Sequence, residues 1–268
     1  MNAHPHGGAD LSRRTEPASN DPLMTEITPQ RSIIDSFDIE SPAATEFRRL
    51  LHNINEIAAK GATSDPADPL GLPSQRKVFM ITSAIVGEGK STIAAYLALT
   101  ASRLKKRRTL LIDCDLRRPT IHHLFSVARN PGLAEALTDR LPAKSVLRRT
   151  ALETLDIITA GKPTQRPTDI FDPVAIRKII DEIVHEYDLV LVDAPPLLPV
   201  SDPMLLMDAM DGALLVIKAG ETQREIVTRA VALLGGTKKL MGVALNNYNQ
   251  SMPYYFDSYY YGYDEQKR

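Results

Sequence analysis

Cysteine is almost absent from this sequence: Cys114 is the only one among 268 residues. A single thiol excludes a disulfide within the chain, and this is typical of proteins from a reducing compartment such as the cytosol. Long apolar runs are absent as well, since none approaches the roughly 20 residues that cross a bilayer. The N-terminus also lacks the charged and then apolar pattern of a secretory signal. We therefore expect a cytoplasmic protein that reaches a membrane only through a partner.

The sequence has no excess of charge of either sign. Lysine and arginine together number 32, and aspartate and glutamate 33, which gives a formal net charge of −1. Nucleic-acid binding usually needs a positive surplus, so the composition predicts no nucleic-acid partner. The chain is long enough for one substantial domain with appendages, or for two small domains. Its hydrophobic content of 43% is ordinary for a soluble globular protein.

Composition divides the chain into four segments. Residues 1–32 are rich in Pro, Gly, Ser, Asn and His, and this predicts disorder. Residues 33–75 are predicted to hold one helix, which begins at Ser41-Pro42, and a linker rich in proline and glycine. Residues 76–247 are predicted to form the main domain, and residues 248–268 a flexible tail. The apolar stripe of the predicted helix consists of Phe47, Leu50, Leu51, Ile54, Ile57 and Ala58.

From Lys77 onward, short apolar runs alternate with stretches of helical periodicity. The helical stretches include Ser91–Lys106, Val174–Glu186 and Glu221–Leu234. Near-continuous apolar strands joined by helices are typical of a parallel sheet covered on both faces. The sequence therefore predicts a doubly wound, mostly parallel α/β domain that binds ligands at the carboxyl ends of its strands. The predicted strands are 78–82, 109–113, 155–159, 189–193, 213–217 and 241–245.

The loop after the first predicted strand matches the phosphate-binding P-loop of nucleoside triphosphatases. It runs from Ala84 to Thr92, and Ala84 replaces the usual first glycine. Glycines in such a loop let backbone N–H groups turn towards phosphates, and the following helix presents its positive N-terminal end to the same anion. Lys90 is expected to reach the β- and γ-phosphates of ATP, and the Ser91 hydroxyl to bind Mg²⁺. The residues predicted to surround the phosphates are Val86, Gly87, Glu88, Gly89, Lys90, Ser91 and Thr92.

Two further predicted strands end in carboxylates. Asp113 and Asp115 end one apolar run, and strand alternation puts them on the same side while Cys114 faces the other way, into packing. Asp193 ends a second run, before two prolines. Because both strands end towards the P-loop, these acids are expected to hold hydrated magnesium and to manage a proton.

Tyrosine is concentrated at the carboxyl end of the chain. Seven of the nine tyrosines lie between Tyr248 and Tyr263, in a segment without helical or strand periodicity. A mobile tail of this kind can enter an active site, so it is a candidate substrate for phosphorylation. The alternative is an aromatic tail that docks on a partner without being modified.

Together these features resemble the bacterial tyrosine kinases of capsule and exopolysaccharide synthesis. The resemblance covers roughly residues 41–268. It implies an ATP-dependent protein-tyrosine autokinase, which acts on the tail of a neighbouring subunit and regulates polysaccharide synthesis or export. It also implies an activating partner, a membrane polysaccharide co-polymerase that regulates chain length. Since this sequence has no spanning segment, it is similar to the split form, which meets that partner at the inner face of the plasma membrane. The segments that carry the resemblance are SAIVGEGKST (83–92), LLIDCDLRRP (110–119), DLVLVDAPP (188–196) and the tyrosine-rich tail.

The resemblance also assigns roles to single residues. Asp113 would be the base that accepts the tyrosyl proton, and Asp115 and Asp193 would support the metal, which Ser91 also binds. Asn246, just after the last predicted strand, would contact the adenine. The implied phosphoacceptors are Tyr254, Tyr255, Tyr259, Tyr260, Tyr261 and Tyr263.

Two arginines after the first acidic motif remain open to several interpretations. Arg117 and Arg118 either orient phosphate, bridge subunits or form a solvated surface pair.

The predicted N-terminal helix departs from the family pattern at one position. That helix often carries Glu-x-x-Arg-x-x-Arg, which joins subunits into a ring. Glu46 and Arg49 match the pattern, but His52 stands where the second arginine is expected. We expect a homo-oligomer that uses Glu46 and Arg49 and whose assembly depends on pH, because a histidine lacks the fixed charge of an arginine.

Two other functions share this fold class. One is an ATP-driven positioning switch of the partition or septum-placement type (ParA/MinD-like). Such switches usually carry an additional lysine five positions before the P-loop lysine, where this sequence has Ile85. The other is a nucleotide-gated adaptor of a polysaccharide exporter that has no kinase activity.

Overall fold

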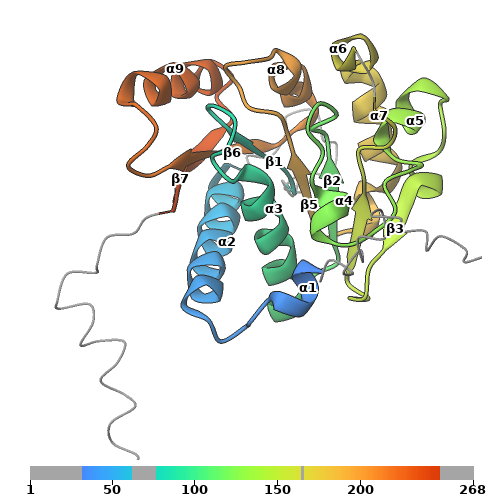
Figure 1. Ribbon diagram of the computed structural model, residues 1–268, viewed down its shortest axis with the longest axis horizontal. Coiled ribbons are helices and arrows are strands. Elements are labelled where there is room, and N and C mark those ends of the chain that lie inside the picture. The colour runs from blue at the N-terminus through green and yellow to red at the C-terminus, as the bar shows by residue number, and fades with distance from the viewer. Residues whose placement is uncertain (1–31, 62–76, 164–165, 248–268) are drawn as a thin grey trace, which may run out of the picture. The chain divides into compact units, whose positions relative to one another are not determined.

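Parallel strands form the centre of the computed structural model, which describes residues 32–61, 77–163 and 166–247 (Figure 1). The predictions of disorder in 1–31, of a linker in 62–75 and of a flexible tail in 248–268 lie outside these described residues. The sheet has the strand order β3-β4-β2-β5-β1-β6-β7. Its strands are β1 (Val78–Ser83), β2 (Thr109–Asp113), β3 (Leu147–Arg149), β4 (Leu155–Ile158), β5 (Leu189–Asp193), β6 (Gly212–Lys218) and β7 (Leu240–Asn246).

The sheet is parallel except at one edge, where β3 runs antiparallel to β4. The predicted doubly wound, mostly parallel fold is therefore confirmed. Each predicted strand matches an observed strand to within one residue at either end. The antiparallel strand β3 was not predicted, because its three residues, Leu147–Arg149, are too few to show a period.

Helices cover both faces of the sheet, and this explains why the strands are apolar on both sides. Phe79 and Ile81 of β1 pack on one face with residues from α1, α2 and α3, whereas Val78 and Met80 pack on the other with residues from α7, α8 and α9. The helices are α1 (Ile33–Ser36), α2 (Pro42–Gly61), α3 (Lys90–Leu99), α4 (Ile121–Leu124), α5 (Leu133–Thr138), α6 (Pro167–Ile170), α7 (Pro173–Ile183), α8 (Asp202–Leu206) and α9 (Arg224–Gly235). None of the helices in the described residues combines the length and the apolar character needed to cross a bilayer.

Helix α2 begins where the sequence predicts, because the Ser41 hydroxyl accepts a hydrogen bond from the Ala44 N–H at 3.2 Å. Its buried side includes Leu51, Ile54 and Ala58, which pack beside α3 (Figure 1). Ile57, which was predicted to belong to the apolar stripe, is 42% exposed. It lies at the border of the stripe, where the helix turns towards solvent.

Two predicted helices differ from the observed ones at their ends. The helix predicted over Ser91–Lys106 is α-helical only from Lys90 to Leu99 and continues as a π-helical turn over Thr100–Leu104. The helix predicted from Glu221 begins at Arg224, because Glu221 and Thr222 belong to a turn after β6.

Candidate active site

The register of three central strands brings the predicted site residues together. Asp113 at the end of β2 lies opposite Asp193 at the end of β5. Asp193 also lies opposite Ile81 of β1. Strand β1 ends two residues after Ile81, at Ser83, and the P-loop follows. The carboxyl ends of the strands therefore meet at one edge of the sheet, as expected for ligand sites in this fold class.

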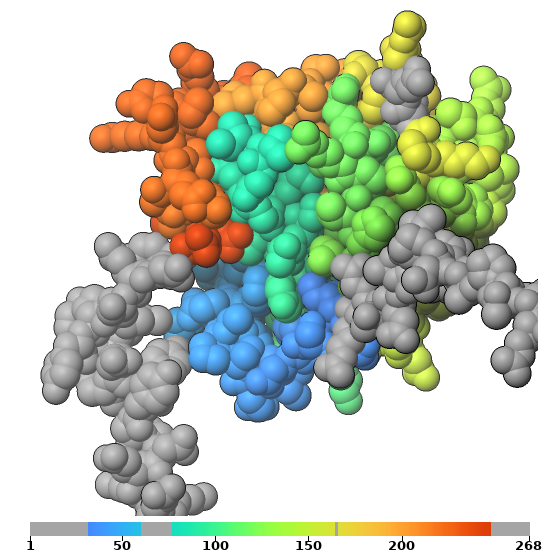
Figure 2. Space-filling view, viewed as in Figure 1, coloured from blue at the N-terminus to red at the C-terminus, as the bar shows by residue number. Residues whose placement is uncertain are grey.

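The P-loop adopts a conformation that requires its glycines. Gly87 and Gly89 have φ values of 91° and 87°, in the left-handed region that side chains with a Cβ rarely adopt. Gly89 is the N-cap of α3, so the free N–H groups at the start of that helix face the same loop. The surface view shows the segment that holds the P-loop beside the segment that follows β2 (Figure 2).

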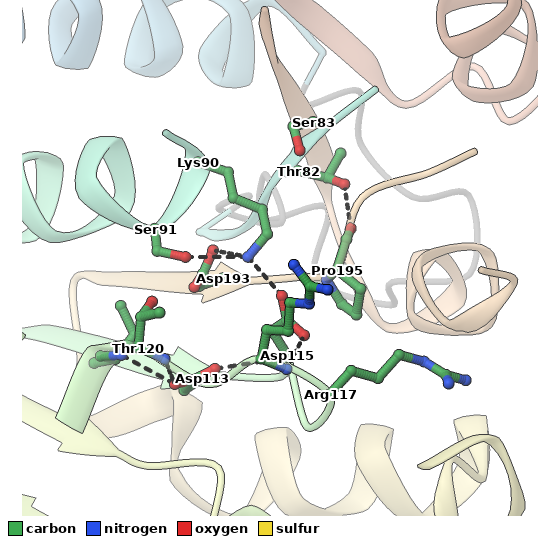
Figure 3. A network of polar contacts seen from close by, with 12 residues as sticks. Thr82, Ser83, Lys90, Ser91, Asp113, Asp115, Arg117, Thr120, Asp193 and Pro195 are labelled. Atoms are coloured by element: carbon green, nitrogen blue, oxygen red, sulfur yellow. Dashed lines mark hydrogen bonds and ion pairs between the residues drawn. The ribbon is translucent and has the colours of Figure 1, made fainter. Parts of the chain in front are cut away.

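Lys90 is the centre of the polar network (Figure 3). Its Nζ lies 2.8 Å from Asp115 Oδ2 and 3.3 Å from Asp193 Oδ1. The same ammonium group lies 3.0 Å from the Ser91 hydroxyl. Only 11% of the Lys90 side chain is exposed. Three separate segments of the chain thus place these four residues within hydrogen-bonding distance of one ammonium group, and their roles stay predictions.

Burial and charge act in opposite directions on Lys90. Burial alone would lower the pKa of the lysine, but the carboxylates of Asp193 and Asp115 outweigh it and raise that pKa. For Asp193, burial raises the pKa of the carboxyl despite the nearby ammonium of Lys90. The second oxygen of Asp193, Oδ2, is buried without a hydrogen-bond partner. The ammonium group of Lys90 thus leaves a buried carboxylate oxygen at this edge of the sheet without a hydrogen-bond partner.

Asp113 lies deeper than the other acids and is fully buried. Its Oδ1 accepts a hydrogen bond from the Asp115 N–H at 3.1 Å. Its Oδ2 accepts hydrogen bonds from the N–H groups of Thr120 at 3.2 Å and Ile121 at 3.1 Å. Burial, followed by the charge of Asp193, raises the pKa of Asp113 well above its usual range. Asp113 therefore organises the turn between β2 and α4, while Cys114 packs into the core as predicted.

The two arginines after Asp115 have different surroundings. The Arg117 Nε lies 2.8 Å from Asp202 Oδ2, and its Nη2 donates to the Thr168 hydroxyl at 2.8 Å. Asp202 is fully buried at the start of α8, so Arg117 joins the loop after β2 to α6 and α8. The Arg118 side chain is exposed and makes no hydrogen bond or ion pair with another described residue.

The network opens into a cavity of about 510 Å³, a size typical of small-ligand sites. Lys90 and Asp115 belong to its wall, whereas Asp113 and Asp193 do not. The segment after β5 forms the opposite wall, and the hydrogen bond from the Thr82 hydroxyl to the Pro195 carbonyl, at 2.6 Å, holds that segment against β1. The lining residues are Val86, Gly87, Gly89, Lys90, Ser91, Thr92, Asp115, Arg117, Arg118, Thr120, Leu124, Pro196, Pro199 and Val200.

The side chains of two residues that were predicted to contact the nucleotide form hydrogen bonds within the protein. The buried Glu88 carboxylate accepts hydrogen bonds from the N–H groups of Ile85 at 2.8 Å and Lys218 at 3.3 Å, and from the Thr222 hydroxyl at 2.6 Å. The Asn246 side chain, at the end of β7, donates to the Glu88 carbonyl at 2.9 Å. Glu88 can therefore contact phosphate only through its backbone. Asn246 lies against the P-loop, so the prediction that it contacts adenine stays a prediction.

The oxygen donors at this edge fit a magnesium ion. A hydroxyl from Ser91 and carboxylates from Asp115 and Asp193 surround the ammonium of Lys90, which stands where a cation is electrostatically required. In the part of the chain that the structure describes, no group of three or more His, Cys, Asp or Glu side chains has the geometry to hold a metal alone. This agrees with Mg²⁺ chemistry, since that ion usually takes one or two protein carboxylates and completes its shell with phosphates and water.

The remaining predicted functional residues lie elsewhere. Glu46 and Arg49 lie on the exposed side of α2 and form an ion pair at 2.9 Å, outside the cavity. The six predicted phosphoacceptor tyrosines lie outside the described residues. Sequence reasoning missed the apolar wall, formed by Leu124, Pro196, Pro199 and Val200, and the holding role of Thr82. Pro196 ends the quoted motif 188–196 but was assigned no role there, and the other four residues belong to no motif, so only the fold brings them to the site.

Comparison with known proteins agrees with this geometry. Residues 76–231 match the family model described as an AAA domain. The tyrosine-protein kinase YwqD of Bacillus subtilis is 33% identical over 218 residues, which cover 81% of this chain and 86% of that protein.

Solved structures show the same relationship. The kinase domain of the Escherichia coli tyrosine kinase ETK superposes with a TM-score of 0.72, at 25% identity and with 87% of each chain covered. The chimerical protein CapA2B2 superposes with a TM-score of 0.70, at 28% identity over 81% of this chain and 90% of that one. The septum site-determining protein MinD of Pyrococcus horikoshii, with a TM-score of 0.56 and 23% identity over 68% of this chain and 76% of that one, shares the fold alone.

Proposed function

The chain belongs to the family of bacterial tyrosine-protein kinases, and from this premise we propose that it transfers the γ-phosphoryl group of ATP to tyrosines of its own sequence. The observation that carries the proposal is the convergence of the Lys90 ammonium, the Ser91 hydroxyl and the carboxylates of Asp115 and Asp193 at one edge of the sheet. Of these four residues, all but the buried Asp193 line the cavity. The P-loop on one side suits a triphosphate, and the apolar wall on the other suits a phenol ring.

The P-loop side of the cavity binds the nucleotide in this proposal. Backbone N–H groups from Val86 to Thr92 surround the phosphates, and Lys90 exchanges its contacts with the carboxylates for contacts with the β- and γ-phosphates. Ser91 and Asp193, with Asp115 through water, would hold Mg²⁺, which would neutralise charge on the phosphates. Asn246 remains the proposed neighbour of the adenine.

Phosphoryl transfer then requires a proton acceptor near the phenol. The tyrosyl oxygen forms a bond to the γ-phosphorus, the bond from that phosphorus to the oxygen of ADP breaks, and the phenolic proton passes to a carboxylate. The resemblance assigns this role to Asp113, but both oxygens of that side chain accept backbone hydrogen bonds, and the side chain does not line the cavity. We assign the proton to Asp115, which lines the cavity, and we assign to Asp113 the positioning of the turn that carries Asp115.

The acceptors and partners follow from the resemblance. The proposed phosphoacceptors are the tail tyrosines between Tyr254 and Tyr263, reached by a neighbouring subunit of a homo-oligomer. The proposed activator is a membrane polysaccharide co-polymerase, which would hold the kinase at the inner face of the plasma membrane and couple it to exopolysaccharide or capsule synthesis.

Phosphotyrosine detection on the purified chain tests the proposal. Incubation with ATP and Mg²⁺ should place phosphate on tyrosines of the 254–263 segment, as mass spectrometry would show. Lys90→Met and chelation of Mg²⁺ with EDTA should each abolish the signal. Because the partner can be needed for activity, a parallel sample contains a peptide from the cytoplasmic segment of a candidate co-polymerase. Absence of tail phosphorylation in both samples would leave the tail as a docking element only.

A further inference from the structure

The Arg118 guanidinium lies at the edge of the proposed active site, and no other described residue forms a hydrogen bond or an ion pair with it. It lines the cavity together with Lys90 and Asp115. Its neighbour Arg117 differs, because the buried carboxylate of Asp202 and the hydroxyl of Thr168 already fix that guanidinium. The backbone of Arg118 is also fixed, since its N–H donates to Asp115 Oδ1 at 2.9 Å. The side chain is thus free to bind a ligand, while its base is held beside the proposed proton acceptor.

The surroundings of Arg118 fit a polypeptide better than a second nucleotide group. The phosphate side of the cavity already contains the P-loop N–H groups and Lys90. Outside the P-loop and the three charged residues Asp115, Arg117 and Arg118, the wall is apolar apart from Thr120, and a flat phenol ring can pack against it. An arginine there would meet a carboxylate carried by the residues that flank the ring.

The tail of this chain contains such carboxylates at defined distances from its tyrosines. Tyr263 is followed directly by Asp264 and Glu265. Asp257 lies two positions after Tyr255 and two positions before Tyr259. In an extended chain, side chains two positions apart lie on the same side, about 7 Å apart, which is within the reach of one arginine. Tyr254, Tyr260 and Tyr261 have no acidic residue within two positions.

We propose that Arg118 is a specificity-determining residue that binds an acidic side chain within two positions of the acceptor tyrosine. This inference rests on the proposed kinase function and names the substrate class of the same site. It ranks Tyr263 first among the acceptors, since two acids follow it, then Tyr255 and Tyr259, and it places Tyr254, Tyr260 and Tyr261 last.

Site-resolved phosphorylation tests the ranking. In the wild-type chain, early phosphate should accumulate on Tyr263 before Tyr260 and Tyr261. Arg118→Gln should lower the ratio of phosphate on Tyr263 to phosphate on Tyr260 by about threefold to tenfold, the range expected for loss of one partly exposed charge pair. Arg224→Gln is the matched control: it removes an exposed arginine at the start of α9, outside the cavity, and should leave the ratio unchanged.

A charge exchange tests the contact itself. Arg118→Glu should disfavour Tyr263, and the combination of Arg118→Glu with Asp264→Lys and Glu265→Lys should restore its preference. A ratio that does not respond to Arg118→Gln would overturn the inference. So would an equal loss at every tyrosine together with a higher KM for ATP, since Arg118 would then contact the nucleotide.

Peptide binding separates this inference from the kinase proposal. A fluorescent synthetic peptide of residues 251–268 should bind the wild-type chain about threefold to tenfold more tightly than the same peptide with Asp257→Asn, Asp264→Asn and Glu265→Gln. Arg118→Gln should remove the difference. If the chain made no phosphotyrosine yet discriminated the peptides through Arg118, the kinase proposal would fail and the recognition would stand. Equal binding of both peptides to the wild-type chain would refute the recognition.

Discussion

At the scale of single residues, the site is defined by an imbalance of charge. The Lys90 ammonium faces the carboxylates of Asp113, Asp115 and Asp193, which are all at most 3% exposed. Buried carboxylates without enough counter-charge are costly, and burial raises the pKa of both Asp113 and Asp193. A second cation would relieve this cost, and this supports the proposal that the nucleotide binds together with Mg²⁺.

Removing the ammonium should therefore destabilise the protein in a pH-dependent way. Lys90→Met leaves Asp115 and Asp193 without their cation, and breaking a buried pair of this kind costs about 3 kcal/mol of unfolding free energy near pH 7.5. A carboxyl group whose pKa is higher in the folded than in the unfolded state lowers the free energy of unfolding. The loss is full above the folded pKa and disappears below the unfolded pKa. The deficit should hence shrink as the pH falls from 7.5 towards 4. Urea unfolding of both proteins across this range measures it, with Lys90→Arg as the control that keeps the charge. A deficit that is constant with pH would contradict the assignment.

The roles of the two neighbouring aspartates should separate in a pair of variants. Asp113→Asn places an amide N–H₂ where the carboxylate accepts backbone N–H groups, so it should lower the unfolding free energy by about 1–3 kcal/mol. Asp115→Asn keeps an acceptor for the Arg118 N–H but cannot take a proton, so it should lower kcat by about 100-fold or more. Chemical denaturation and initial rates of tail phosphorylation measure the two effects. An Asp113→Asn variant that is as stable as the wild type but inactive would show that Asp113, and not Asp115, accepts the proton.

How far the residues could be assigned from sequence depended on how local their contacts are. Asp113 and Asp193 end parallel strands, and Lys90 and Ser91 begin the helix after the P-loop, so their convergence could be predicted from the parallel order of the strands. The different surroundings of Arg117 and Arg118 could not be predicted, because the partner of Arg117 is Asp202, which is 85 positions away in the sequence. Glu88 could not either, since its partners Lys218 and Thr222 are 130 and 134 positions distant.

At the scale of elements, Glu88 fastens the P-loop to the end of β6. One of its oxygens accepts from the Ile85 N–H within the loop, and the other accepts from the N–H of Lys218, the last residue of β6, and from the hydroxyl of Thr222 in the turn that follows. Because Asn246 of β7 binds the Glu88 carbonyl, the loop conformation also depends on the edge strand that precedes the tail. The nucleotide site and the exit of the tail thus share one hydrogen-bond network.

Removing the hydrogen bonds of the Glu88 side chain should weaken nucleotide binding, although this side chain does not contact the nucleotide in the proposed function. Glu88→Ala leaves the partly buried N–H groups of Ile85 and Lys218 without this acceptor, at a cost of about 1 kcal/mol each, part of which falls on the loop conformation that is proposed to bind phosphate. We expect the Kd for ATP to rise about tenfold. Thr222→Val removes one bond of the same network and should have a smaller effect. Isothermal titration with ATP and Mg²⁺ decides, and an unchanged Kd for Glu88→Ala would show that the loop holds its shape alone.

The helices and strands could be predicted from the sequence where every residue of the element is buried. The central strands are apolar on both faces, and their boundaries agree with the predictions to within one residue. Prediction failed at β3, a three-residue edge strand of sequence Leu-Arg-Arg, and at the change from α3 to a π-helical turn at Thr100. Both are set by tertiary contacts: β3 exists only by pairing with β4, and in the π-helical turn Arg103 donates to the carbonyls of Ile34 and Phe37. Neither contact leaves a periodic signal.

At the scale of the whole molecule, α2 has one side in the core and another available to a second copy. Ala44, Leu51 and Ile54 are buried, whereas Glu46, Arg49 and His52 follow one another at three-residue intervals on the exposed side. The ion pair between Glu46 and Arg49 is more than half exposed, and a pair in that position contributes little, at most about 1 kcal/mol, to the stability of the monomer. The pair itself is therefore only a small obstacle to an interface on this side of α2.

Assembly through this side of α2 should respond to pH and to phosphorylation. Multi-angle light scattering of unphosphorylated protein should show a larger assembly at pH 6 than at pH 8, because a histidine stands where the family pattern has the fixed positive charge of an arginine. His52→Arg should make the assembly large at both pH values. Asn53→Arg, which adds the same charge at the adjacent exposed position, should not. Incubation with ATP and Mg²⁺ should shrink the assembly, since each tail phosphate adds about −1.5 to −2 charges and the tails repel one another. One constant mass from pH 6 to pH 8 in the wild-type chain would refute the role of His52, and Arg49→Glu distinguishes the remaining cases: if it leaves that mass unchanged, α2 is not the interface.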